Sequence, residues 1–202
     1  MPKKDYVHLC IVLDASGSMN CIADDIKGSF NAFMDEQKNQ EGQTVFDVFQ
    51  FSSQVRRIVK HADMSEYSGD LVSSYCCQGN TALFDAVCTA IDTVGSELAA
   101  MPEEERPEHV IFAIATDGHE NASREYTLAD TKERIDRQSN KYAWEFIYLA
   151  ADQSEFEARH ISRSMGIAGS STVDKACFCR MAVTTLKESV TNARKGCSKK
   201  KN

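Results

Sequence analysis

Two nearly continuous apolar runs, at residues 7–13 and 109–115, constrain the fold of this chain more than any other feature. Each run follows charged residues and leads directly into a polar loop. A strand that is apolar at almost every position is typical of the centre of a parallel sheet covered on both faces. The two runs therefore predict two central, parallel strands.

Helical spacing of apolar residues separates the predicted strands. Between Asn20 and Gly42 apolar residues recur at intervals of three or four, and the same spacing returns from Leu83 to Leu98. These patterns predict crossover helices. We expect further strands at residues 45–51, 55–60, 144–149 and 171–173, and further helices at residues 128–138, 155–165 and 177–192.

The order of these elements predicts an α/β fold. Strands alternate with helices except where only Ser52, Ser53 and Gln54 separate two strands, so one edge strand should run antiparallel. The predicted architecture is a doubly wound, mostly parallel central sheet with one antiparallel edge strand and helices on both faces. With 202 residues, of which 42% are apolar, we expect a single domain at residues 5–193 and a basic, disordered tail at residues 194–202.

Charge and cysteine content narrow the expected partners and compartment. The net charge is −7 although the tail carries five basic residues and no acidic one, so we expect the domain to attract cations rather than nucleic acid. No apolar run approaches the roughly 18 residues of a membrane-spanning helix, and no signal-type apolar stretch follows the first residues. Eight cysteines without such a signal are interpreted as reduced thiols, which predicts a cytoplasmic protein.

Oxygen-bearing side chains occupy three loops at the predicted strand ends. Asp14, Ser16 and Ser18 follow the first buried strand, Thr81 precedes the helix that starts at about residue 83, and Asp117 follows the second buried strand. Each alone is well explained as a turn or helix-cap residue. Together, at the edge where open α/β sheets bind ligands, they form a suitable shell for a hard cation, and we predict that they bind Mg²⁺ or Mn²⁺. Helix starts after Ser18 and Thr81 should also direct unpaired N–H groups toward an anionic partner.

The same residues resemble a known metal site. The D-x-S-x-S loop at residues 14–18, the later Thr81 and the T-D-G turn at residues 116–118 are similar to the metal-ion-dependent adhesion site (MIDAS) of von Willebrand factor A domains, in order and in placement. Residues 117–125 further resemble bacterial stand-alone members of that family. The resemblance implies that the serines bind the ion directly, that Thr81 and Asp117 exchange between direct and water-mediated contact, and that Asp14 acts through water or hydrogen bonds.

The expected function is metal-dependent binding of another protein. An ion held largely by neutral hydroxyls keeps much of its positive charge and can take an outside carboxylate as its last ligand. We therefore expect a non-enzymatic module without catalytic residues, whose partner protein supplies an aspartate or a glutamate.

Two other functions stay open on the sequence. A Mg²⁺-dependent phosphohydrolase could use Asp14 as its nucleophile, although a haloacid-dehalogenase-type enzyme carries a second aspartate where this chain has Ser16. A thiol-based redox sensor could use Cys76 and Cys77, although these lack the C-x-x-C spacing.

The histidines are interpreted as structural residues. His119 and Glu120 could form an acid and base pair, but a polar loop that rims the site is the better interpretation. His8 lies in a buried strand and is expected to be packed there. The sequence identifies no partner for His61.

Overall fold

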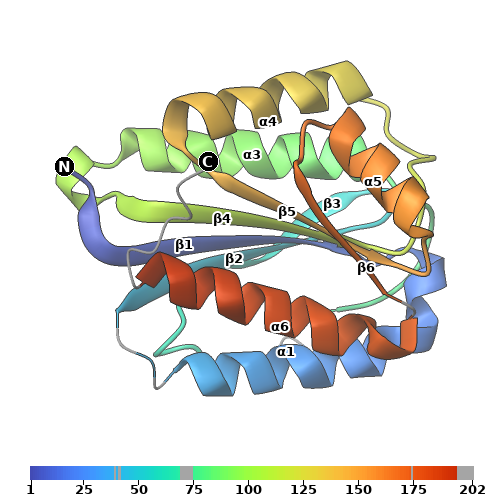
Figure 1. Cartoon of the computed structure of the whole chain (residues 1–202), viewed down its shortest axis with the longest axis horizontal. Coiled ribbons are helices and arrows are strands. Elements are labelled where there is room, and N and C mark those ends of the chain that lie inside the picture. Colours follow the sequence, from blue (N-terminus) through green and yellow to red (C-terminus); the bar gives the residue numbers. More distant parts are fainter. Residues whose placement is uncertain (39, 41, 69–74, 174, 195–202) are drawn as a thin grey trace.

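Six strands form one mixed sheet (Figure 1): β1 (Lys3–Asp14), β2 (Gln43–Phe51), β3 (Val55–Asp63), β4 (Pro107–Thr116), β5 (Glu145–Ala151) and β6 (Gly169–Val173). The computed structural model of the chain describes residues 1–38, 40, 42–68, 75–173 and 175–194, with the backbone alone described at 169–173 and 175–178. The strand order is β3-β2-β1-β4-β5-β6. Among the strands of the described residues, β2 and β3 alone pair antiparallel, and β3 is an edge strand.

Helices cover both faces of the sheet, which confirms the predicted doubly wound architecture (Figure 1). α3 (Leu83–Ala100), α4 (Leu128–Tyr142) and α5 (Glu155–Ser164) lie on one face. α1 (Ala23–Gln37) and α6 (Lys175–Arg194) lie side by side on the other face. Two 3₁₀ helices, Gly17–Ile22 and Glu103–Glu105, precede α1 and β4.

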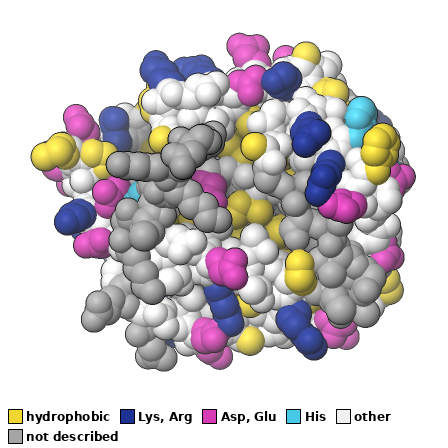
Figure 2. Space-filling model, viewed as in Figure 1, with side chains coloured by type: hydrophobic (Ala, Val, Ile, Leu, Met, Phe, Trp, Pro, Cys, Tyr) yellow, Lys and Arg dark blue, Asp and Glu magenta, His cyan; other side chains and the backbone are white. Residues whose placement is uncertain are grey.

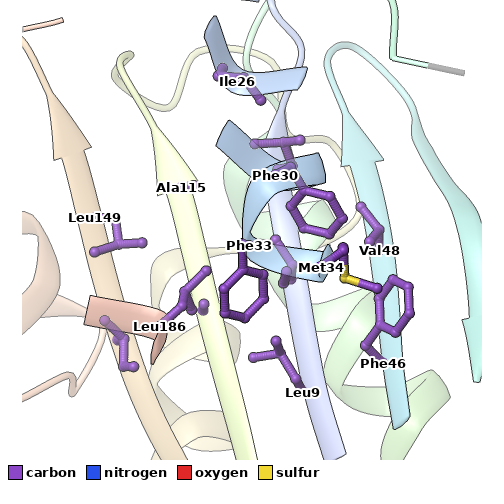
Figure 3. Packing of buried hydrophobic residues seen from close by; sticks show 14 of the residues in the cluster. Leu9, Ile26, Phe30, Phe33, Met34, Phe46, Val48, Ala115, Leu149 and Leu186 are labelled. Carbon is purple, nitrogen blue, oxygen red and sulfur yellow. The ribbon is translucent and has the colours of Figure 1, made fainter. Parts of the chain in front are cut away.

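Strand alternation divides the buried side chains into two cores. Odd-numbered residues of β1 such as Leu9 face α1 and α6, where they pack with Phe30, Phe33 and Leu186 (Figure 3). Even-numbered residues such as Val12 face the opposite side and pack with the apolar stripe of α3. Burial of each large apolar side chain stabilises the fold by roughly 2 kcal/mol. The central strands are therefore apolar on both faces because both faces are covered.

Most element boundaries differ from the sequence-based expectation by a few residues, and two of the differences change how the helices are described. The helix expected directly after Ser18 begins only at Ala23, because the chain first makes a 3₁₀ helix. Arg194, which was assigned to the tail, is the last residue of α6 and donates hydrogen bonds to Thr44 Oγ1 (3.0 Å) and Gln37 Oε1 (3.0 Å). α6 thus extends one residue past the predicted domain boundary. The rest of the tail and its predicted disorder lie outside the described residues.

The surface seen in Figure 2 mixes charges of both signs. Acidic and basic side chains are interspersed over the side of the molecule shown, which includes parts of α4 and α6. Lys132 Nζ and Asp136 Oδ2 on α4, 2.8 Å apart, are one such pair. Within the described ranges, no helix combines the length and the apolar character that crossing a membrane requires.

Candidate metal site

The five predicted ligands converge at the carboxyl ends of the central strands. β1 and β4 are neighbours, and the chain leaves them in opposite directions, toward β2 and toward β5. This is the position at which open α/β sheets bind ligands. β1 ends at Asp14, and β4 ends at Thr116, directly before Asp117. Two loops that are about one hundred residues apart in sequence therefore meet, because their strands pair in parallel.

The loop after β1 is fixed by backbone hydrogen bonds. Ala15 N–H donates to Phe51 O at the end of β2 (2.7 Å). Gly17 N–H donates to Gly79 O (3.0 Å), and Gln78 N–H donates back to Ala15 O (2.8 Å). The segment before α3 is thus tied to the serine loop, and hydroxyl groups from both segments project from one rigid frame.

Ser16, Ser18 and Asp117 form a connected set of oxygen atoms. The Oγ atoms of Ser16 and Ser18 are hydrogen-bonded at 3.1 Å, and the Ser18 hydroxyl donates to Asp117 Oδ1 at 2.7 Å. Neighbouring ligands of an octahedral Mg²⁺ with bonds of about 2.0–2.1 Å lie roughly 2.9 Å apart. The two observed separations bracket this value. Ser18 Oγ therefore already lies from both of its neighbours at the spacing of adjacent ligands of one hard cation.

Asp14 is the fully buried member of the site. Its Oδ1 accepts the Ser16 N–H (2.7 Å), and its Oδ2 accepts the Thr116 hydroxyl (2.5 Å). The Tyr75 hydroxyl donates to its backbone oxygen (2.5 Å). Burial raises the pKa of Asp14, the Thr116 and Ser16 hydrogen bonds oppose this rise, and the charge of Asp117 adds to it. Because both carboxylate oxygens are engaged, Asp14 is suited to act through hydrogen bonds, as the resemblance implies.

Thr81 is positioned by the loop that follows β4. Asn121 Oδ1 accepts the Thr81 N–H (2.9 Å), and Asn121 N–H donates to Thr81 O (3.0 Å). Gly118 lies close to Thr81 and Asp14: a Cβ at this position would be 3.1 Å from Thr81 Oγ1 and 3.9 Å from Asp14 Oδ2. Glycine at position 118 therefore leaves the Thr81 hydroxyl undisturbed beside Asp14.

Glu120 and Asp85 fasten the rim of the site. Glu120 Oε2 accepts the N–H of Phe84 in the first turn of α3 (3.1 Å), and its Oε1 accepts the N–H of Ser123 (2.7 Å). The Asp85 carboxylate accepts the three N–H groups of residues 124–126 at 2.8, 3.0 and 2.9 Å. The expectation that the N–H groups of α3 await an anionic partner is therefore wrong at Phe84, because Glu120 already binds there. Sequence reasoning did not identify either role, since both depend on contacts between distant loops.

A second polar cluster, which the sequence did not predict, lies on β1, β2 and β3. His8 Nε2–H donates to Asp47 Oδ2 (2.6 Å), and His61 N–H donates to Asp47 Oδ1 (2.8 Å), so His61 does have a partner. Arg57 donates to Asp47 Oδ1 (2.7 Å) and binds Glu97 through both terminal nitrogens (2.6 and 2.7 Å). Burial opposes ionisation of Asp47, but the His8, His61 and Arg57 interactions outweigh it and lower its pKa. An aspartate within an apolar strand was the signal that could have indicated this cluster.

Comparison with solved structures identifies the fold. The chain matches a von Willebrand factor type A protein from Catenulispora acidiphila with a TM-score of 0.60 and 16% identity, over 93% of this chain and 43% of that chain. It matches the vWF domain of the type V pili tip protein Mfa5 from Porphyromonas gingivalis with a TM-score of 0.65 and 9% identity, over 97% of both chains. No protein-family model and no curated protein matches the chain. The chain has the von Willebrand factor A fold.

A further match has a metal in the corresponding motif. Proximal thread matrix protein 1 from the mussel byssus, with a zinc-occupied MIDAS motif, matches with a TM-score of 0.58 and 17% identity. The match covers 92% of this chain and 46% of the mussel chain, so this chain spans less than half the length of that protein.

Proposed function

We propose that this chain is a metal-dependent protein-binding module of the adhesion type, in which Ser16, Ser18, Thr81 and Asp117 would hold Mg²⁺ or Mn²⁺ and Asp14 would position them. The spacing of the Ser16, Ser18 and Asp117 oxygens, 3.1 and 2.7 Å between neighbours, carries the proposal. The fold and the zinc-occupied MIDAS motif of the mussel protein support a metal at this place. A set of hydroxyl and carboxylate oxygens without thiolate favours a hard cation.

The site is built to accept an acidic group from outside the chain. When bound, the ion supplies a positive centre with room for a further oxygen ligand. Ser16 and Thr81 are buried, whereas Ser18 is exposed and Asp117 is half-buried, so the site opens on the side of Ser18 and Asp117. Three of the four ligands are neutral hydroxyls, and the Asp117 carboxylate compensates only one of the two positive charges of the ion. We propose that an aspartate or glutamate of a partner protein completes the shell.

Metal binding is tested by isothermal titration calorimetry with Mg²⁺ and with Mn²⁺. Wild-type protein is compared with Asp117→Ala and with Asp35→Ala, a matched aspartate on α1 whose side chain is 75% exposed. We expect one ion per chain in the wild type and in Asp35→Ala, and none at this site in Asp117→Ala. Equal binding by all three proteins would remove the metal assignment.

The partner chemistry is tested by selecting peptides from a displayed library in Mg²⁺ and eluting them with EDTA. We expect the eluted peptides to share an aspartate or glutamate whose replacement by asparagine or glutamine abolishes binding. Ser18→Ala should bind none of them, whereas Ser96→Ala, an exposed serine on α3, should bind them all. Binding that persists in EDTA, or that does not need the acidic residue, would contradict an adhesion-type mechanism.

We propose that the module is not an enzyme. As a phosphohydrolase nucleophile, Asp14 would need a carboxylate oxygen free to attack a substrate. Instead its side chain is fully buried, and both of its oxygens accept hydrogen bonds. A phosphatase screen should show no metal-dependent turnover. Turnover that is lost in Asp14→Asn would reverse this ranking.

A redox function of the adjacent cysteines is not favoured. Burial raises the pKa of the Cys77 thiol, whereas a reactive cysteine needs a lowered pKa. Cys76 is exposed, so alkylation near neutral pH reports on it directly. We expect labelling at the rate of an ordinary exposed thiol, and faster labelling would support a sensor. A cytoplasmic location stays a prediction from the cysteine content.

A further inference from the structure

Two imidazoles and a carboxylate converge well away from the strand ends. One ligating atom each from His8, Asp47 and His61 lies within 4.8 Å of the other two. His8 and Asp47 are fully buried, and the rings of His8 and His61 meet edge to face with centroids 5.3 Å apart. His8 precedes Asp14 by six residues, which along a strand is roughly 20 Å. This cluster is therefore separate from the site at the strand ends.

A β-bulge brings His61 to this cluster. The pairing of β2 with β3 shifts register at Asp47, where β3 contains one residue more than β2. In a regular strand, Lys60 and His61 would point to opposite faces of the sheet. Here Lys60 Nζ lies 3.8 Å from Glu97 of α3, while the ring of His61 meets that of His8, which lies on the same face. Bulges of this kind re-aim side chains and are frequent beside functional sites.

His61 adopts a strained backbone conformation at the bulge. Its φ is 42°, in the left-handed region that disfavours side chains other than glycine. Such a conformation costs on the order of 1 kcal/mol and persists where the surrounding structure holds it. The Asp47 carboxylate holds it here by accepting the His61 N–H at 2.8 Å.

Two buried ring nitrogens of the cluster have unsatisfied hydrogen-bonding capacity. Among the described residues, neither His8 Nδ1 nor His61 Nδ1 has a hydrogen-bond partner. The other nitrogen of each ring is engaged, since His8 Nε2 contacts Asp47 Oδ2 at 2.6 Å and His61 Nε2 contacts the Tyr6 hydroxyl at 3.3 Å. Unpartnered buried polar atoms are rare in folded proteins and require an explanation. An ion bound by His61 Nδ1 provides one for that ring, because its Nε2 is already in contact with Tyr6.

We propose that His8, Asp47 and His61 form a second metal site, selective for a transition metal ion of the Zn²⁺ type. Imidazole nitrogen with carboxylate oxygen suits Zn²⁺ and not Mg²⁺. Bonds of about 2.0–2.2 Å place the ligands of one tetrahedral ion roughly 3.4 Å apart, a spacing that small side-chain rotations reach from the observed cluster. To bind the ion through Nε2, His8 takes the tautomer that carries its proton on Nδ1, so a neutral imidazole and the Asp47 carboxylate hold the ion where they now share a proton.

The surroundings of the cluster support a bound cation. Arg57 and the His61 N–H hold Asp47 Oδ1, so Oδ2 remains for the ion. The Tyr6 hydroxyl contacts His61 Nε2 and orients that ring, as outer-shell partners of metal-binding histidines do. Glu97 binds the Arg57 guanidinium through both terminal nitrogens, and the exposed Lys60 Nζ lies 3.8 Å from Glu97, so the two carboxylates and the two cations around the cluster sum to zero charge.

Equilibrium dialysis with Zn²⁺ in the Asp117→Ala variant tests this proposal, because that variant lacks a ligand of the strand-end site. We expect Asp117→Ala to keep one Zn²⁺ per chain. The double variant with His61→Gln should bind it about 100-fold more weakly or not at all. The double variant with His160→Gln, an exposed histidine on α5, should bind it unchanged. Absence of Zn²⁺ in Asp117→Ala, or equal binding with His61→Gln, would overturn the proposal.

Two spectroscopic readouts exclude other origins of the binding. Co²⁺ in place of Zn²⁺ should give a tetrahedral visible spectrum without the near-ultraviolet charge-transfer band of thiolate ligands. A thiolate band at one equivalent would assign the ion to cysteines instead. Zn²⁺ should also shift the ring-nitrogen resonances of His8 and His61 but not those of His160, a measurement that needs no variant in the cluster. Unshifted His8 and His61 resonances would overturn the proposal, whatever the Mg²⁺ titration of the wild type shows.

Discussion

Replacing Asp14 by asparagine is expected to stabilise the metal-free protein. The amide has nearly the same shape, so its oxygen can accept the Ser16 N–H that now lies 2.7 Å from Oδ1, and its nitrogen can donate to the Thr116 hydroxyl. Each of the two hydrogen bonds loses on the order of 1 kcal/mol when the charge disappears. Burial and the charge of Asp117 nevertheless raise the pKa of Asp14. The free energy needed to keep the carboxylate ionised is therefore larger than the stabilisation from its two hydrogen bonds. The net effect of the substitution is therefore a gain.

The gain should depend on pH in a defined direction. The pKa of the Asp14 carboxyl is higher in the folded state than in the unfolded state, where it is near 3.8. The contribution of Asp14 to stability is therefore fully present below pH 3.8 and is lost as the pH rises through the pKa of the folded state. Asparagine does not titrate. In urea unfolding with EDTA present, the free energies of unfolding of Asp14→Asn and wild type should differ little at about pH 4. At pH 7 the variant should be clearly more stable than wild type.

Mg²⁺ should stabilise the wild type more than the variant, because the variant lacks the negative charge of Asp14 beside the ion. At a Mg²⁺ concentration 100 times Kd, the ion stabilises the folded wild type by about 2.7 kcal/mol. For a chain of this length, that corresponds to a rise in Tm of about 5–11 °C, measured by circular dichroism. A variant that is less stable than wild type in EDTA at pH 7 would refute the electrostatic reasoning. Equal Mg²⁺-induced shifts in Tm would refute the role of Asp14 in the metal site.

Three further substitutions test separate parts of the structure. Gly118→Ala places a Cβ 3.1 Å from Thr81 Oγ1 and should weaken Mg²⁺ binding about tenfold, measured by calorimetry. A Cβ at Gly28 meets no atom within 4 Å, so Gly28→Ala should leave the affinity unchanged. Equal affinities in these two variants would exclude Thr81 from the shell. Arg57→Met leaves the buried Asp47 short of a partner and should cost about 3–5 kcal/mol at pH 7. Because folding lowers the pKa of Asp47, its carboxylate stabilises the fold above about pH 3.8, and this stabilisation is lost as the pH falls through the pKa of the folded state. The loss of unfolding free energy in Arg57→Met, measured by urea unfolding, should therefore shrink toward acid pH. A loss that does not change with pH would contradict the ion pair between Arg57 and Asp47. Gln153, just before α5, donates to Gly118 O at 3.3 Å, so α5 begins beside the metal site. Phe156 on α5 is 80% exposed and can contact a partner bound there. Phe156→Ala should therefore weaken partner binding by about 2 kcal/mol without changing Mg²⁺ affinity. Unchanged partner affinity would place α5 outside the interface.

The fold was predictable because its strongest signals are local. Helices bury the runs at residues 7–13 and 109–115 from both sides, so replacing one of their apolar residues by a polar one would destabilise the fold. The three loops that carry Asp14, Thr81 and Asp117 were predicted to meet for a topological reason, since parallel neighbours end at the same edge. Periodicity and connection length were enough for the fold, whereas the grouping of Thr81 with the other site residues also depended on their oxygen-bearing side chains and on the resemblance to the MIDAS.

The remainder depends on register and on long-range contacts. One extra residue in β3 decides that His61 faces His8, and no propensity marks the position of that bulge. The role of Glu120 at the start of α3 requires two loops to meet across 36 positions of sequence. Asp47 lies in the strand predicted at residues 45–51, and its partners become visible only once β1, β2 and β3 are aligned. These features are set by tertiary structure.

Anomalous diffraction from crystals grown with Mn²⁺ tests the central claim most directly. We expect a peak within bonding distance of Ser16 Oγ, Ser18 Oγ and an oxygen of Thr81 or Asp117, with Asp14 still hydrogen-bonded to Thr116. A map without a peak at this place, with the Ser18 hydroxyl still donating to Asp117 at saturating Mn²⁺, would contradict it. So would a peak at His8, Asp47 and His61 alone.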